Sequence, residues 1–79
     1  MTKSVFSNRY QILLTELVEA RRLAGITQVE LARKLKKPQS YISKVERGER
    51  RLDVIEFLDL AEAIGLEPDS VIRRFHQRS

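Results

Sequence analysis

The residues of this chain that are best suited to chemistry are polar and cationic side chains between positions 39 and 47. On a helical wheel, Ile42 and Val45 form an apolar side. The opposite side carries Ser40, Ser43, Lys44 and Arg47, and Gln39 lies at its N-terminal end. This outward side has no large apolar residue. It suits the major groove of DNA, which admits one helix and presents hydrogen-bond donors and acceptors.

Other kinds of chemistry have little support in the sequence. The chain has no cysteine and one histidine, His76, so thiol catalysis and thiolate metal sites are excluded. A zinc site needs several nitrogen or sulfur ligands and is not expected. Neither a phosphate-binding glycine loop nor paired carboxylates in a recognisable pocket pattern occur. We therefore expect no enzyme activity, no metal and no cofactor.

Charge is distributed unevenly along the chain. Residues 25–51 contain eight basic and three acidic residues, a net charge of +5, whereas residues 52–79 carry a net charge of −3. A basic stretch in an otherwise balanced chain indicates a polyanionic partner such as nucleic acid.

The length of 79 residues predicts one small domain, 7–79, preceded by a flexible leader, 1–6. No apolar run approaches the roughly 20 residues of a membrane span, and no signal peptide is evident. We expect no membrane partner and a cytoplasmic location.

The spacing of apolar residues and capping residues predicts five helices and no strand, an all-α fold. The expected helices begin at Ser7 or Asn8, Thr27, Pro38, Asp53 and Pro68. In the first helix the expected apolar stripe is Tyr10, Leu13, Leu14, Leu17, Val18, Leu23 and Ala24, and the fourth helix is expected to bury Ile55, Phe57, Leu58, Ala61 and Ile64.

The second and third helices form a helix-turn-helix unit over about 27–48. Thr27 and Glu30 have the spacing of a capping box. Ala32 is small enough to let the two helices cross closely. The third helix, over about 38–47, would be the recognition helix.

The runs GITQVELA (25–32), SYISKVERG (40–48) and FLDLAEAIG (57–65) resemble the Cro/cI-type helix-turn-helix family, also called the xenobiotic-response-element type. The resemblance covers roughly residues 10–75. It implies a five-helix, lambda-repressor-like domain that binds double-stranded operator DNA, usually as a dimer, and regulates transcription. One departure is Lys36, because the family usually has glycine at this turn. A left-handed residue other than glycine costs roughly 1 kcal/mol.

The resemblance also implies roles for individual residues. Base contacts are expected from Gln39, Ser40, Ser43 and Lys44, and phosphate contacts from Gln28, Tyr41, Arg47, Arg50 and Arg51. Gln39 holds the position that reads a base, and glutamine pairs bidentately with adenine. For Tyr41 a half-buried packing role is an equal alternative, and the three arginines could instead be solvated charges.

Two further expectations concern assembly and stability. Arg21 and Glu46 match a family pair that forms an inward-facing salt bridge. The last two helices carry more apolar side chains than one chain is expected to bury, so a homodimer is predicted through Leu60, Ile64, Leu66, Val71, Ile72 and Phe75.

A second functional class stays open from the sequence. An antitoxin-like interaction module with this fold would mask an unknown partner protein and regulate its own synthesis. Such a module would need a partner-binding tail, and few residues follow position 75.

Overall fold

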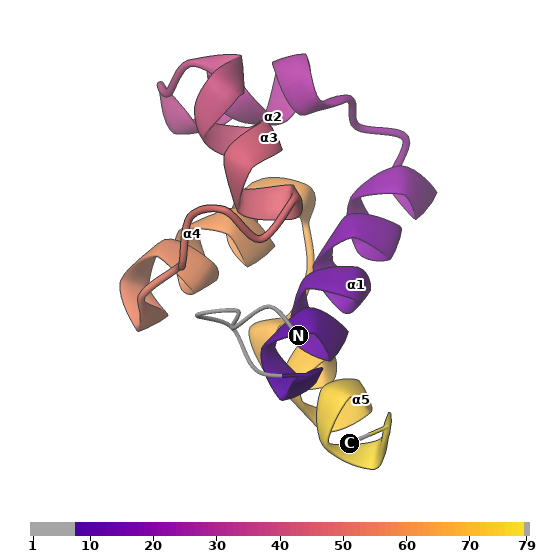
Figure 1. The fold of residues 1–79 in the computed structure, drawn as a ribbon. Helices are drawn as coiled ribbons and strands as arrows, with labels where there is room; N and C mark the ends of the chain where they lie inside the picture. Colours follow the sequence, from indigo (N-terminus) through magenta and orange to yellow (C-terminus); the bar gives the residue numbers. More distant parts are fainter. Residues whose placement is uncertain (1–7, 79) are drawn as a thin grey trace.

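The structure is a computed structural model, and it describes residues 8–78. Over this range it has five helices and no strand: α1 (Asn8–Leu23), α2 (Gln28–Leu35), α3 (Gln39–Glu46), α4 (Val54–Ile64) and α5 (Pro68–Arg78). The predicted all-α class is confirmed. The expected leader, 1–6, and Ser7 lie outside the described residues. In Figure 1, α2 and α3 form one end of the molecule, and α5 packs against α1 at the other end.

Capping boxes define the starts of α2 and α4. Thr27 Oγ1 accepts a hydrogen bond from the Glu30 backbone N–H at 3.0 Å, and Glu30 Oε1 accepts one from the Thr27 N–H at 2.9 Å. Asp53 and Glu56 make the same reciprocal pair, at 2.7 and 2.9 Å. Each box satisfies two backbone donors that a helix start would otherwise leave unpaired. The predicted caps at Thr27 and Asp53 are both confirmed.

The turn between α2 and α3 depends on a left-handed lysine. Lys36 has φ 57° and ψ 43°, as expected for the position where the family usually has glycine. Two backbone hydrogen bonds close the turn, from Lys36 N to Arg33 O (3.1 Å) and from Lys37 N to Ala32 O (2.9 Å). The chain therefore forms the sharp turn that directs α3 across α2, despite the side chain at position 36.

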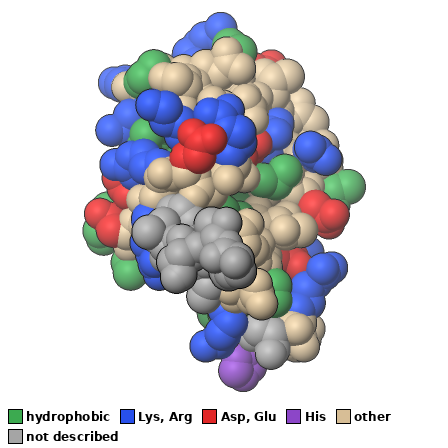
Figure 2. Space-filling view, in the orientation of Figure 1, with side chains coloured by type: hydrophobic (Ala, Val, Ile, Leu, Met, Phe, Trp, Pro, Cys, Tyr) green, Lys and Arg blue, Asp and Glu red, His purple; other side chains and the backbone are tan. Residues whose placement is uncertain are grey.

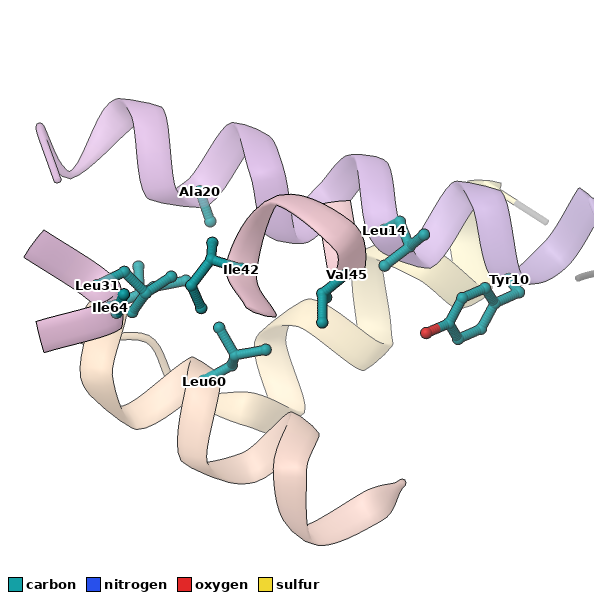
Figure 3. Packing of buried hydrophobic residues seen from close by; sticks show 9 residues of the cluster. Tyr10, Leu14, Ala20, Leu31, Ile42, Val45, Leu60 and Ile64 are labelled. Atoms are coloured by element: carbon teal, nitrogen blue, oxygen red, sulfur yellow. The ribbon is translucent and has the colours of Figure 1, made fainter. Parts of the chain in front are cut away.

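The main core lies where α1, α2, α3 and α4 meet (Figure 3). Leu31 and Ile42 are fully buried, and Val45 is 2% exposed. Leu14 and Ala20 from α1 and Leu60 and Ile64 from α4 enclose them. Burying Ile42 and Val45 sets the rotation of α3, so that its opposite side must face outward.

Three expected core positions, Leu23, Ala24 and Ile55, are wrong. Leu23, at the end of α1, is 85% exposed, and Ala24 after it is also exposed. Leu23 is the last residue of α1 and belongs to neither apolar cluster of the described residues. Ile55 is 63% exposed. It lies two residues before the buried Phe57, which places it on the opposite side of α4.

A buried carboxylate connects α1 to α5. Glu16 is 5% exposed, and its Oε2 lies 2.7 Å from Arg78 Nε. Its Oε1 lies 3.5 Å from Arg74 Nε. The two arginines are one helical turn apart, so they reach the same carboxylate. This ion pair supplements the second apolar cluster, in which Leu17, Phe57 and Val71 join α1, α4 and α5.

Candidate nucleic-acid interface

The outward side of α3 carries the side chains that the sequence singles out for base contacts. Gln39, Ser40 and Lys44 are exposed, and Ser43 is half-buried. The Ser43 hydroxyl donates to the Ser40 carbonyl at 3.3 Å. In Figure 2, Lys and Arg side chains gather over the part of the molecule that carries α2 and α3, with acidic side chains among them. The arrangement gives a protruding polar helix edge flanked by positive charge, which fits a groove lined by phosphates.

Arg21 and Glu46 form a two-point ion pair beneath this surface. Arg21 Nε donates to Glu46 Oε2 at 2.6 Å, and Nη2 donates to Oε1 at 3.0 Å. The third guanidinium nitrogen, Nη1, donates to the Ile26 carbonyl at 2.8 Å. The side chains are 10% and 14% exposed. Glu46 is thus occupied by a structural contact at the inner side of α3.

The pair extends to the surface through two glutamines. Gln28 Nε2 donates to Glu46 Oε1 at 2.8 Å, and Gln39 Nε2 lies 3.4 Å from Gln28 Oε1 as a donor. A carboxylate can only accept, so Glu46 fixes which end of the Gln28 amide points toward it. The Gln28 oxygen is then presented to the Gln39 amide nitrogen. The structure therefore brings Arg21, Gln28, Gln39 and Glu46 into one connected chain, although only the first and last had been paired from the sequence.

The arginines that follow α3 differ in their surroundings. Arg47 pairs with Glu49 through Nε–Oε2 at 2.9 Å and Nη2–Oε1 at 3.1 Å. Arg50 pairs with Glu56 at 3.1 and 3.0 Å, and its Nη1 also donates to the Arg51 carbonyl at 3.1 Å. Arg51 lies over the Tyr10 ring, 5.0 Å from its centroid. These contacts hold the three guanidinium groups in defined places at the C-terminal end of α3.

Tyr41 is half-buried between two cations. Arg50 lies 4.8 Å from its ring centroid, and Lys37 Nζ lies 5.2 Å from it. Burial raises the pKa of the Tyr41 hydroxyl above its ordinary value, and the carboxylate of Glu56 adds to the rise. The phenol is therefore a neutral donor at physiological pH. This packing contact was one of the two alternatives for Tyr41, and it leaves the phosphate contact as a proposal.

The apolar residues predicted for a dimer interface do not form one surface, which corrects that expectation. Val71 is fully buried, and Leu60 and Ile64 are 4% and 6% exposed, so all three belong to the core of a single chain. Leu60 and Ile64 are buried where α4 meets α1, α2 and α3, and Val71 is buried where α5 meets α1 and α4. Leu66 and Phe75 are half-buried, and Phe75 lies under Arg9 at 5.2 Å. Of the six residues, only Ile72, at 45%, is clearly exposed.

A different apolar surface lies beside Ile72. The side chains of Leu13, Val54, Phe57, Leu58, Pro68 and Ile72 line a hollow between α1, α4 and α5. Val54, which the sequence analysis did not single out, is 72% exposed on its rim. The signal that could have found it is an apolar residue directly after the Asp53 helix cap.

Membrane and metal sites find no support in residues 8–78. None of the helices there has both the length and the apolar character to cross a bilayer. The same residues contain no group of three or more His, Asp or Glu side chains placed to hold a metal ion.

Comparisons with known proteins agree with this geometry. The family model described as Helix-turn-helix matches residues 17–71. The chain is similar to the solved structure of an XRE-family like protein from Pseudomonas syringae pv. tomato str. DC3000, at 51% identity over 91% of this chain and 88% of that one, with a TM-score of 0.87. It is also similar to the restriction-modification controller protein C.AhdI from Aeromonas hydrophila, at 31% identity over 82% of this chain and 98% of that one, with a TM-score of 0.73. No curated protein matches the chain.

Proposed function

Because the chain belongs to the XRE, or Cro/cI-type, helix-turn-helix family of DNA-binding transcription regulators, we propose that it controls transcription by binding a specific double-stranded operator. In this proposal α3 enters the major groove of DNA. The protein acts in the cytoplasm as a homodimer. The observation that carries the proposal is the place of Gln39 at the exposed start of α3, in contact with Gln28, whose amide is oriented by the Arg21–Glu46 pair.

Gln39 has the chemistry to select adenine. Its amide nitrogen has two hydrogens, so it can donate one to Gln28 and the other to adenine N7, while its oxygen accepts from adenine N6. The contact with Gln28 restricts the side chain before DNA arrives. Less conformational entropy is then lost on binding. Ser40, Ser43 and Lys44 lie further along the same side of α3 and share the remaining base contacts.

The proposed phosphate contacts come from residues at the two ends of the helix-turn-helix unit formed by α2 and α3. Gln28 is the first residue of α2, and its backbone N–H is among those left without a partner inside the helix, which suits a phosphate oxygen. Arg47, Arg51 and the Tyr41 hydroxyl follow the backbone on the other side of the groove. Arg50 lies on the same surface. It also has a structural role, since it contacts the Tyr41 ring and pairs with Glu56 of the α4 capping box.

Two copies are proposed to associate through the hollow that Val54, Leu58 and Ile72 help to line. One recognition helix covers only a few base pairs, and two-fold symmetry would place a second helix about 34 Å away in the next major groove. Exposed Val54 and Ile72 would gain burial in such an interface. A Val54→Glu substitution should weaken association. Leu23→Glu is a matched control because Leu23 is also an exposed apolar residue but does not line the hollow.

Selection of bound duplexes from a random pool tests the proposal directly. We expect enrichment of a sequence with two related half-sites about one helical turn apart. Sedimentation of the protein with and without the selected duplex then reports the oligomeric state. Failure to enrich any sequence would overturn operator recognition, and a monomer at tens of micromolar under both conditions would overturn the dimer.

A further inference from the structure

Glu49 places a negative charge inside the surface proposed to face DNA. Both of its carboxylate oxygens accept hydrogen bonds from Arg47, at 2.9 and 3.1 Å. The two residues are separated by Gly48, whose φ of 78° reverses the chain after α3. Two backbone bonds hold this reversal in place, from Glu49 N to Lys44 O at 2.8 Å and from Arg50 N to Lys44 O at 3.2 Å. The carboxylate is thus directed back to the end of the recognition helix by the backbone itself.

This pair is open to exchange with a competing anion. The side chains of Arg47 and Glu49 are 55% and 54% exposed. By contrast, the Glu56 side chain is 25% exposed, and its carboxylate also accepts from the Asp53 backbone N–H. Removing Arg50 from Glu56 would therefore disturb a helix cap. Removing Arg47 from Glu49 disturbs nothing else in the described contacts of that carboxylate.

Glu49 carries its charge at neutral pH. Hydrogen bonds from Arg47 lower the pKa of the Glu49 carboxyl, and the charges of Arg47 and Lys44 lower it further. An ionised carboxylate cannot donate to phosphate, and it repels the DNA backbone at short range. At a DNA phosphate it therefore opposes binding.

We propose that Glu49 is an internal counter-ion for Arg47, which a DNA phosphate must displace before Arg47 can bind the backbone. The inference rests on the proposed DNA binding. It makes Glu49 a residue that sets affinity rather than sequence preference, because phosphate contacts position the protein without reading bases. Its effect should depend on Arg47 and on the salt concentration.

The experiment measures binding of selected and scrambled duplexes across a salt series. Glu49→Gln keeps the shape of the side chain and removes its charge. We expect affinity for both duplexes to rise about two- to fivefold at low salt, the range typical of an exposed ion pair. The slope of log affinity against log salt should steepen by up to about 0.9, because no Glu49 carboxylate is left to take up a cation when Arg47 moves to a phosphate.

Two comparisons make the result specific. Glu19→Gln changes the net charge equally, but Glu19 is an exposed residue of α1 beside the end of α5, so its effect should be clearly smaller. In an Arg47→Ala background, the gain from Glu49→Gln should fall to that of Glu19→Gln, because the carboxylate then repels DNA without restraining Arg47. This double-mutant cycle isolates the pair. An NMR titration should also show the pKa of the Glu49 carboxyl rising toward its ordinary value in Arg47→Ala.

The outcomes separate the two proposals. A wild-type protein that binds neither duplex at any salt overturns the proposed function and this inference with it. If the wild type binds but Glu49→Gln gains no more than Glu19→Gln, the inference is wrong and the proposed function stands. A gain that is undiminished in the Arg47→Ala background also overturns it, because Glu49 would then act by repulsion alone and not by restraining Arg47.

Discussion

Arg21 and Glu46, 25 residues apart in the sequence, meet in a two-point ion pair at 2.6 and 3.0 Å. The pair joins the end of α1 to the end of α3, and Gln28 adds the start of α2 through a 2.8 Å hydrogen bond to the same carboxylate. Three helices, α1, α2 and α3, are therefore joined at the Glu46 carboxylate. Because Gln39 is contacted by Gln28, the same charge also orients the side chain proposed to read a base.

We predict that Glu46→Ala destabilises the fold far more than Glu49→Ala. Removing Glu46 leaves Arg21, whose side chain is 10% exposed, with an uncompensated charge. Breaking a buried pair in this way costs about 3–5 kcal/mol of unfolding free energy. Urea unfolding of both variants measures the difference. Equal and small shifts in the midpoint would show that solvent already compensates the Arg21–Glu46 pair.

A second prediction concerns the left-handed turn at Lys36. Replacing Lys36 with glycine should raise the unfolding free energy by up to about 1 kcal/mol, because glycine tolerates a positive φ without steric cost. The neighbouring Lys37→Gly is the matched control. Lys37 does not have a positive φ, so glycine there should only add freedom to the unfolded chain and lower stability. If both variants melt alike, the turn stores no strain.

Removing the arginine partners of Glu16 should lower the free energy of unfolding more than removing Glu16 itself. In an Arg74→Ala, Arg78→Ala double variant, a side chain that is 5% exposed loses both cations. We expect a loss of about 3–5 kcal/mol of unfolding free energy, the cost of leaving a buried charge uncompensated. Glu16→Leu leaves only two half-exposed arginines, which water can solvate, so its stability should be near or above that of the wild type. A larger loss for Glu16→Leu would contradict this.

The free energy of unfolding should fall in acid because three carboxylates become protonated. The pKa of Glu56 is lowered from its ordinary value of 4.5, chiefly by hydrogen bonds from Arg50, and the pKa values of Glu30 and Glu49 are lowered by the Thr27 N–H and by Arg47. A lowered folded-state pKa adds stability above the unfolded value and loses it as pH falls through the folded value. Unfolding free energy should therefore be level down to about pH 5 and decline below pH 4.5. Glu56→Gln should reduce the steepness of that decline, and an unchanged profile would contradict the assignment.

Local patterns carried most of the fold prediction. Thr27 and Asp53 were recognisable as caps because capping depends on residues three positions apart. The inward side of α3 followed from Ile42 and Val45 alone. Arg21–Glu46 was anticipated from the family resemblance, since no local spacing connects two residues on different helices.

Burial that depends on the packing of distant elements could not be predicted. Leu23 and Ile55 are apolar residues at plausible helical spacing, and both are exposed because no neighbouring helix covers their positions. Leu60 differs in the opposite sense, because it was expected at a dimer interface and is buried in the core of one chain. Glu16 was overlooked because a glutamate in a helix is ordinarily solvated, although Arg74 and Arg78, four residues apart, offered a hint.

The last prediction separates base recognition from phosphate binding at the two ends of the recognition unit. Gln39 lies at the start of α3, and Arg51 follows its end, where its guanidinium stacks 5.0 Å from the Tyr10 centroid. Gln39→Ala should weaken binding to the selected duplex by about 1–3 kcal/mol, leaving scrambled DNA and the salt slope nearly unchanged. Arg51→Ala should weaken both duplexes together and flatten the slope by about 0.9, because it neutralises a phosphate in every sequence. The two effects should add in the double variant, since the residues share no contact. If Gln39→Ala instead weakens both duplexes alike in a salt titration, Gln39 does not read a base and the recognition side of α3 must be reassigned.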